Sequence, residues 1–398
     1  MLLILKIKQY FLGQVLPLIS FQLSSFILPW LTTIWLTYKY GLNETGSFTF
    51  ALAVISPISL MLASPSRNYL LTQKSIVNIS LYCRIILMAV GFIIAGVIGV
   101  YFETVYLFTI LFLFKSSELL LDVPISIAIH KNNIKSLWLL NLIKWAIIIV
   151  IAIAAFSIGS IELLYFLFFL AFLITSIFST KKENRKGNIK QIVNLLTLSI
   201  PLGLSALVFS FHFNIPRYVI GLDNQNELLA IYSISSFLIM GAIVLINILV
   251  QVKLPILSQA FKTNLKTFQK ESIKLIVVAI FIYFILQLGH ISFISQLFWN
   301  IHNNVQQNNI AYSELYTQII LLAWGPICFS LINYFLIISN QHKTLLYITL
   351  FNLFFTYLTC TISYEFFGIN NLIWAYNLGC ILQSILIFIF FKSNKKHG

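Results

Sequence analysis

Long apolar runs alternate with short polar connections along the whole chain. A run of about 18 or more apolar residues can cross roughly 30 Å of hydrocarbon as a helix. Lipid offers backbone groups no hydrogen-bond partners, so a spanning segment of this kind must be helical. Each run therefore predicts one transmembrane helix. We identify twelve runs, at residues 10–37, 48–66, 80–101, 104–129, 136–157, 160–179, 192–216, 228–250, 273–289, 315–338, 344–364 and 370–391.

The composition agrees with this pattern. Apolar residue types make up 59% of the 398 residues, and charged types only 9%. A soluble domain is typically about a quarter charged, so this chain has too little polar surface to cover a globule in water. The sequence predicts an all-α integral membrane protein with about 12 transmembrane helices.

The basic residues fall mainly on alternate connections. The net charge is +14, yet Lys39 and Arg217 are the only two of the 25 basic residues assigned to one side of the predicted membrane. Lys115 and Lys144 lie inside predicted helices, and the rest belong to the other side. The positive-inside rule then places both termini in the cytoplasm. The excess charge reflects topology, with anionic membrane lipids as its partner and no nucleic acid expected.

The polar connection "TKKENRKGNIK" follows the sixth apolar run and predicts a division into two lobes. The expected lobes are residues 1–185 and 186–398, each with six helices, around a central cavity. Two lobes with even helix numbers enter the membrane from the same side, so they would be parallel repeats. The stretches "VLPLISFQLSSFILPW" and "SIPLGLSALVFSFHFNIPR" open the two lobes with a similar pattern, and Lys39-Tyr40 occupies the place of Arg217-Tyr218.

The stretch "FHFNIPRYVIGL" places three polar side chains, His212, Asn214 and Arg217, between long apolar runs. Pro216 is expected to mark the outer end of the seventh helix, because proline removes a backbone donor. Arg217 would then lie at the outer interface. It could extend its charged head to water there, or it could bind an anion, and the pattern leaves both interpretations open.

Charged residues also lie inside the predicted membrane. Lys115, Glu118 and Asp122 are spaced i, i+3, i+7, which places them on one stripe of a helix. A charge near the centre of a span costs about 2.5–3.5 kcal/mol, so these side chains should face protein or water. Lys144 is expected at the same depth as Asp122 and able to pair with it. The set could be a structural ion-pair network or an ion-coupling relay, with Lys115 the better candidate for a substrate contact.

Other kinds of chemistry have little support. Cys83, Cys328, Cys360 and Cys380 fall in or beside apolar runs, where cysteine is usually a small packing residue. Their spacing indicates no metal site, and no cofactor motif is present. No exposed set of acid, base and nucleophile can be assembled, so we do not expect an enzyme.

The stretch "FNIPRYVIGLDNQNELLAIYSISSFLIMGAIVLINILVQVKLPILSQAFK" resembles the O-antigen and capsule polysaccharide flippases. These belong to the multidrug/oligosaccharidyl-lipid/polysaccharide (MOP) exporter superfamily. Asn214, Pro216, Arg217 and Tyr218 match an Asn-x-Pro-Arg-Tyr element of that family. The stretch "YGLNETGSFTFALAVISPISLMLASPSRNYL" is similar to its first outer loop and second helix, with Arg67 at an inner basic position.

The fourth helix of that family is similar to "KSSELLLDVPISIAIHKNN". Lys115 stands where an arginine is common, and Glu118 and Asp122 supply the acids. The basic residue often found in the first helix is missing, which weakens the case for anion binding by that helix.

The resemblance implies a flippase that moves an undecaprenyl-pyrophosphate-linked oligosaccharide across the bacterial cytoplasmic (inner) membrane by alternating access. Such a protein would serve O-antigen, lipopolysaccharide or capsule biosynthesis, with a polysaccharide polymerase and a chain-length regulator among its expected partners. Glu118, Asp122 and Lys144 would couple transport to ions or form ion pairs. The implied substrate-binding residues are Arg217, Lys39, Arg67, Lys115, His212 and Asn214.

Two alternatives remain open from the sequence. A membrane polysaccharide polymerase or ligase would usually carry a large outer loop with catalytic Arg or His, whereas the longest outer connection here, about 290–314, contains no Lys or Arg. A drug exporter of the same superfamily would share the fold and differ in the charge of its cavity.

Overall fold

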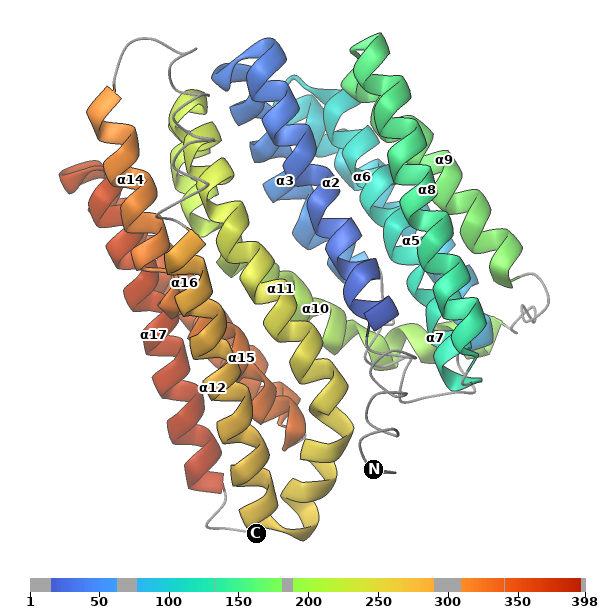
Figure 1. The fold of residues 1–398 in the computed structure, drawn as a ribbon, viewed down its shortest axis with the longest axis vertical. Coiled ribbons are helices and arrows are strands. Elements are labelled where there is room, and N and C mark those ends of the chain that lie inside the picture. The colour runs from blue at the N-terminus through green and yellow to red at the C-terminus, as the bar shows by residue number, and fades with distance from the viewer. Residues whose placement is uncertain are drawn as a thin grey trace. The chain divides into compact units, whose positions relative to one another are not determined.

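The computed structural model describes residues 16–62, 77–131, 133–180, 189–289, 309–339 and 341–394 (Figure 1). All regular structure in these ranges is helical, and ten helical spans are long and apolar enough to cross a membrane. The predicted all-α membrane class is confirmed. The helices are α2 (Leu16–Tyr40), α3 (Leu42–Leu62), α5 (Val77–Tyr101), α6 (Val105–Leu120), α7 (Asp122–His130), α8 (Ile134–Ile158), α9 (Ile161–Thr180), α10 (Ile189–Leu222), α11 (Asn226–Thr263), α12 (Leu265–Gly289), α14 (Asn309–Leu321), α15 (Trp324–Ile338), α16 (His342–Phe367) and α17 (Ile369–Asn394).

Within the described residues, each predicted apolar run coincides with helix, but two of the runs are broken. The run at 104–129 forms α6 and α7, and the run at 315–338 forms α14 and α15. Pro124 lies on the third residue of α7, and Pro326 lies on the third residue of α15. A proline has no N–H for the carbonyl four residues earlier, and its ring clashes with that carbonyl. Both breaks are therefore local consequences of the sequence.

Proline does not end the seventh predicted helix, which corrects the expectation for Pro216. Helix α10 continues through Pro216 to Leu222. Helices α2 and α3 also contain internal prolines, Pro29 and Pro57. Membrane helices tolerate such residues because neighbouring side chains and small local adjustments satisfy the freed carbonyl.

The chain packs into two compact units. Within the described ranges, unit 1 lies in residues 1–28 and 51–210, and unit 2 lies in residues 29–50 and 211–398. Helices α2, α3 and α10 therefore each contribute to both units. The expected lobe boundary, between residues 185 and 186, lies outside the described residues. The division into lobes at that boundary and the central cavity stay predictions.

Unit 1 is built around α6, which packs against α5 and α9 (Figure 1). Its centre is an aromatic cluster in which the ring of Phe114 lies 4.7 Å from Tyr165 and 5.9 Å from Phe168. These rings are fully buried, and the buried ring of Phe172 stacks on Phe168 as part of the same cluster. Their packing holds α6, the helix that carries Lys115 and Glu118, against α9.

In unit 2, α11 packs against α12 and α15, and α17 packs against α15 and α16. A second aromatic cluster, Phe261, Phe268, Phe335 and Phe391, joins α11, α12, α15 and α17. Many large apolar side chains on the outer helix faces are exposed, including Phe354 at 71% and Phe281 at 63%. Such faces suit contact with lipid, because a helix bonds its own backbone groups internally and these side chains present only apolar surface.

Candidate functional site

Unit 1 contains a buried ion cluster centred on Glu118 of α6. One carboxylate oxygen lies 3.2 Å from the ammonium of Lys144 on α8, and the other lies 3.3 Å from the ammonium of Lys115. Lys144 is 1% exposed and also donates to the carbonyl of Phe21 and the hydroxyl of Ser25 on α2. The Lys144 ammonium has three N–H groups, and each finds an acceptor. Lys144 is therefore fully engaged within unit 1.

The expected pairing of Asp122 with Lys144 is wrong. Asp122 is the first residue of α7, after the break at Leu121, and it pairs with Arg84 of α5 at 3.8 Å. The stripe predicted from the i, i+7 spacing required a continuous helix. A one-residue turn at Leu121 separates α6 from α7 between Glu118 and Asp122, and the two carboxylates, one turn apart, have different partners.

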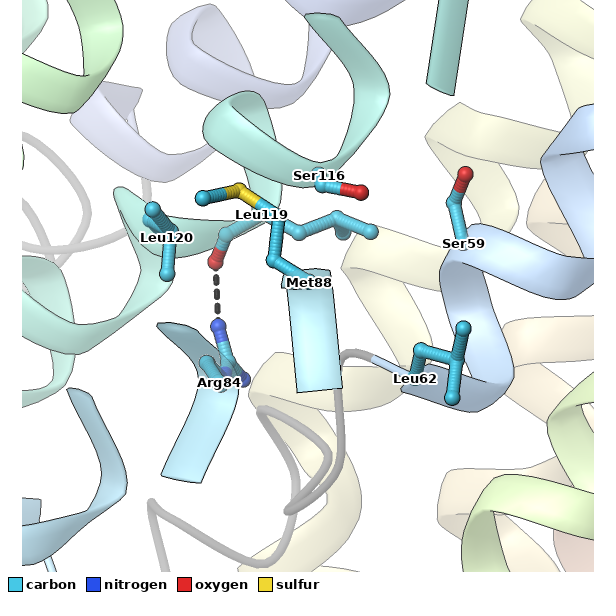
Figure 2. A pocket seen from close by; sticks show the side chains of 7 residues that line it. All are labelled: Ser59, Leu62, Arg84, Met88, Ser116, Leu119 and Leu120. Atoms are coloured by element: carbon cyan, nitrogen blue, oxygen red, sulfur yellow. Dashed lines mark hydrogen bonds between the residues drawn. The ribbon is translucent and has the colours of Figure 1, made fainter. Parts of the chain in front are cut away.

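Arg84 bridges the two sides of this break. Its Nη1 donates to the carbonyl of Leu119 (Figure 2). The same atom lies 3.8 Å from a carboxylate oxygen of Asp122. The Arg84 side chain is only 2% exposed. The sequence placed Arg84 among the basic residues of the inner side and missed this contact. The proline at 124 was the available signal, because a helix break leaves carbonyls that need donors.

A very small cavity of about 10 Å³ lies beside Arg84. Figure 2 shows its lining side chains, with the Arg84–Leu119 hydrogen bond on one side and Ser59 and Leu62 of α3 on the other. A void of this size is at the lower limit for one water molecule. The lining residues are Ser59, Leu62, Arg84, Met88, Ser116, Leu119 and Leu120.

The ion cluster of unit 1 carries more positive than negative charge. Lys115, Lys144 and Arg84 supply three cations, while Glu118 and Asp122 supply two carboxylates. Lys115 is the most exposed member at 18%, compared with 1% for Lys144 and 2% for Arg84. An incoming anion could therefore reach Lys115 more readily than the other two cations.

Arg217 is a buried cation in unit 2, and its position differs from the outer interface that the sequence predicted. It lies inside α10 and is 8% exposed, so it is buried among helices and does not project into water at an interface. Its Nη1 donates to Asn214 Oδ1 at 2.8 Å, and its Nη2 donates to Ser236 Oγ at 3.0 Å. The guanidinium carbon lies 5.6 Å from the ring centre of Phe237. The predicted neighbours Arg217 and Asn214 are brought together by one turn of helix.

Within the described part of the chain, no carboxylate lies at ion-pair distance from Arg217, and its partners are neutral. A cavity of about 20 Å³ adjoins the guanidinium, with Tyr232, Ser236 and Tyr376 among its walls. This space would hold about one water molecule. The arrangement is a buried cation held by neutral hydrogen-bond acceptors beside a small, mostly apolar void.

His212 belongs to a different network inside unit 2. Its Nε2 lies 2.9 Å from the amide nitrogen of Asn352 and 3.3 Å from the hydroxyl of Thr356. The ring stacks on Phe329 at 4.7 Å, and Gln383 extends the chain of hydrogen bonds from Asn352. Buried polar contacts of this kind join helices in membranes at about 0.6 kcal/mol each. The sequence placed His212 beside Arg217 in a substrate site, whereas the structure engages it with α16.

Two predicted cations remain, Lys39 and Arg67. Lys39 is exposed near the end of α2, with its ammonium 5.2 Å from the ring centres of both Trp35 and Tyr40. Arg67 lies outside the described residues. Among the described residues, no group of three or more His, Cys, Asp or Glu side chains could hold a metal ion.

Solved structures similar to this one are transporters of the MOP superfamily. The outward-facing conformation of a multidrug resistance MATE family transporter matches with a TM-score of 0.68 at 14% identity, covering 97% of this chain and 95% of that chain. A MOP superfamily transporter from Pyrococcus furiosus, described as having reversed polarity of its binding pocket, gives the same values. MATE in the bent conformation matches with a TM-score of 0.66 at 14% identity over 97% of this chain and 95% of that chain.

These likenesses establish the fold: the chain has the fold of MATE transporters of the MOP superfamily. No protein-family model matches the sequence, and no curated protein sequence matches it.

Proposed function

We propose that the protein is a transporter that moves a lipid-linked oligosaccharide with an anionic diphosphate group across the bacterial cytoplasmic membrane. The observation that carries the proposal is Arg217, a buried guanidinium with only neutral partners in the described part of unit 2. The MOP-type fold supports transport as the general activity. The identity of the substrate rests on charge.

A buried cation without a counter-ion is costly. A cation buried without a counter-ion loses its hydration, and the two hydrogen bonds of Arg217 to neutral groups offset only part of this loss. The planar guanidinium presents five N–H groups in a fork that matches two oxygens of a phosphate. Binding a diphosphate would supply the missing negative charge, so Arg217 would favour an anionic substrate.

Unit 1 adds a second cationic position in the proposed mechanism. Lys115 shares Glu118 with Lys144, so one carboxylate offsets two ammonium groups. Lys115 is more exposed than Lys144, so a diphosphate would reach Lys115 before Lys144. Protonation of Glu118, or binding of a cation to it, would remove the negative charge that pairs with Lys115. In the proposal, this change in the charge next to Lys115 couples transport to an ion gradient.

A drug exporter is the alternative, because the similar structures include a multidrug resistance transporter. Exporters of cationic drugs need acidic groups in the binding region. The buried charged side chains described in unit 2 include Arg217 and no carboxylate. This difference favours an anionic substrate over a cationic drug.

The test is binding of a short isoprenoid diphosphate, farnesyl diphosphate, to the purified full-length protein in detergent. Arg217→Gln should weaken binding about 10- to 100-fold, as expected for the loss of one charge-assisted interaction of about 1.5–3 kcal/mol. Arg217→Lys should retain part of the affinity. Lys135→Gln, an exposed cation on α8, is the matched control and should bind as the wild type does.

In the host cell, Arg217→Ala should abolish surface glycan while the protein stays in the membrane at normal levels. Two results would count against the proposal. One is unchanged farnesyl diphosphate binding by Arg217→Gln, and the other is saturable binding of the cation tetraphenylphosphonium with no binding of the diphosphate.

A further inference from the structure

Unit 2 contains a groove that none of the predicted site residues line. It has a volume of about 720 Å³, whereas the cavities beside Arg84 and Arg217 measure about 10 and 20 Å³. This volume is in the range of sites for small organic molecules, about 300–1,000 Å³. Its lining residues are Val219, Leu222, Asp223, Gln225, Leu228, Tyr357, Thr361, Tyr364, Glu365, Gly368 and Ile369.

The groove lies between the turn that joins α10 to α11 and the turn that joins α16 to α17. Basic residues are scarce on this side of the predicted membrane, which the positive-inside rule assigns as the outer side. Gly368 forms the α16–α17 turn with φ +79°, a conformation that other residues rarely adopt. The turn therefore bends sharply at the rim of the groove without placing a side chain there.

One wall of the groove is a stripe on α16. Tyr357, Thr361 and Tyr364 follow the spacing i, i+4, i+7, which keeps all three on one face of the helix. Tyrosine offers both an apolar ring and a polar hydroxyl. The stripe thus combines flat apolar rings with hydroxyl groups. A sugar ring has C–H faces that can pack on such rings and hydroxyls that can bond to such groups.

The opposite wall holds a fixed hydrogen-bond acceptor. The carboxylate of Asp223 accepts from the Gln225 side-chain amide at 2.9 Å and from the Tyr364 hydroxyl at 3.3 Å. Two neutral donors therefore orient this carboxylate. Glu365 is exposed and adds a second carboxylate to the lining. Carboxylate and amide oxygens are strong acceptors for hydroxyl donors.

The charge of the lining separates this groove from the Arg217 site. The lining contains two acidic residues and no Lys or Arg, so it would repel a diphosphate. A lipid tail is also a poor occupant, because the hydroxyl, amide and carboxylate groups would lose hydrogen bonds to it. What remains is a neutral hydroxyl-rich group or a cation. Asp223 already accepts hydrogen bonds from two neutral donors, and the tyrosine stripe offers apolar rings with hydroxyl groups. Both features favour a neutral hydroxyl-rich group over a cation.

We propose that this groove binds neutral sugar rings, namely the saccharide part of the substrate whose diphosphate contacts Arg217. The inference rests on the proposed function, but it concerns a separate surface with its own ligand. Free neutral sugars therefore test it without the lipid or the diphosphate.

The experiment is saturation-transfer NMR on the purified full-length protein with a panel of neutral tri- and tetrasaccharides of hexose and N-acetylhexosamine. We expect saturable binding by at least one sugar. Tyr357→Ala and Glu365→Ala should each weaken it at least about 10-fold, and Tyr357→Phe, which keeps the ring, should retain most of it. Tyr347→Ala and Glu227→Ala alter exposed residues of the same types outside the groove and serve as matched controls.

The outcomes separate the two proposals. Arg217→Gln should leave neutral-sugar binding unchanged even if it abolishes diphosphate binding. The groove proposal fails if no sugar of the panel binds, or if the groove variants bind like the controls. It also fails if tetraphenylphosphonium binds saturably and Glu365→Ala removes that binding, because the groove would then be a cation site. Equal unfolding midpoints for all variants would show that loss of binding does not come from loss of folding.

Discussion

At the scale of single residues, the buried cations of this protein differ in their partners. Lys144 has a carboxylate, a carbonyl and a hydroxyl around its ammonium group. Arg217 has a side-chain amide oxygen and a hydroxyl. Fully matched charges of the first kind hold helices together, while a cation with only neutral partners keeps its capacity to bind an anion. This contrast is the reason for proposing a structural role for Lys144 and a substrate contact for Arg217.

The structural role of Lys144 gives a stability prediction. Lys144→Met removes one of the two cationic partners of the buried Glu118 carboxylate and leaves Lys115 as the other. Breaking a buried ion pair from one side costs at most about 3–5 kcal/mol, and the remaining Lys115 contact lowers this cost. The apparent free energy of unfolding in detergent should fall by up to that amount. Lys135→Met, an exposed lysine on the same helix, should change it by less than about 1 kcal/mol. A Lys144→Met protein as stable as the Lys135→Met control would show that the Lys144–Glu118 pair contributes nothing to folding.

At the scale of secondary-structure elements, the short turn between α6 and α7 lies where charged groups of unit 1 pair. Pro124 cannot donate to the carbonyl of Leu120, and the chain makes a single turn at Leu121 before α7 starts. Arg84 supplies a side-chain donor at this point through its bond to the Leu119 carbonyl. The Leu119 carbonyl is next to the Leu120 carbonyl that Pro124 leaves without its usual donor, and buried carbonyls near such a turn need hydrogen-bond donors in a membrane protein.

Replacing Arg84 by lysine tests this role. A single guanidinium nitrogen, Nη1, contacts both the Leu119 carbonyl and the Asp122 carboxylate. Lysine has a compact, strongly hydrated ammonium on a flexible stem, so it would not be held at this position as the planar guanidinium is. Arg84→Lys should therefore lose about 1–3 kcal/mol of stability, the cost of leaving a buried acceptor unsatisfied. Amide hydrogen exchange should accelerate around residues 117–123. Thr109→Val, which removes a hydroxyl bonded only within α6, is the control. Unchanged exchange at 117–123 in Arg84→Lys would show that the break is stable without the guanidinium.

At the scale of the whole molecule, the distribution of basic residues predicts which connections face the cytoplasm. Helix α11 has 38 residues and is about 57 Å long, more than the roughly 30 Å of bilayer hydrocarbon. The α10–α11 turn and the α11–α12 turn should therefore lie on opposite sides of the membrane. The second turn is rich in lysine, with Lys262, Lys266 and Lys270 around it, so it should be cytoplasmic.

Cysteine labelling tests this topology in a chain whose four native cysteines have been replaced. Gln225→Cys should react with a membrane-impermeant maleimide in intact cells, because it lies at the α10–α11 turn and is exposed. Lys266→Cys should react only after the cells are permeabilised. Labelling of Lys266→Cys in intact cells would reverse the predicted orientation, and with it the assignment of the groove to the outer side.

The sequence alone determined where the helices run and that charged groups lie among them. Both follow from local chemistry, because a long apolar run in lipid must be helical and ionisable residues within such a run are visible by type. The similarity to MOP-type flippases predicted the helical membrane fold, and the solved structures confirm a MOP-superfamily fold. The glycan and the role of each site residue stay predictions.

Only the tertiary structure decided which charges meet. Spacing on an ideal helix put Asp122 with Lys144, but in the folded chain Lys144 pairs with Glu118 and Asp122 pairs with Arg84. Likewise Pro216 suggested a helix end, while the continuing α10 buries Arg217 and turns His212 toward Asn352. An ion pair depends on the direction in which each side chain leaves its helix and on the neighbour it meets. Those quantities arise from packing between helices far apart in the chain, so residue spacing cannot supply them.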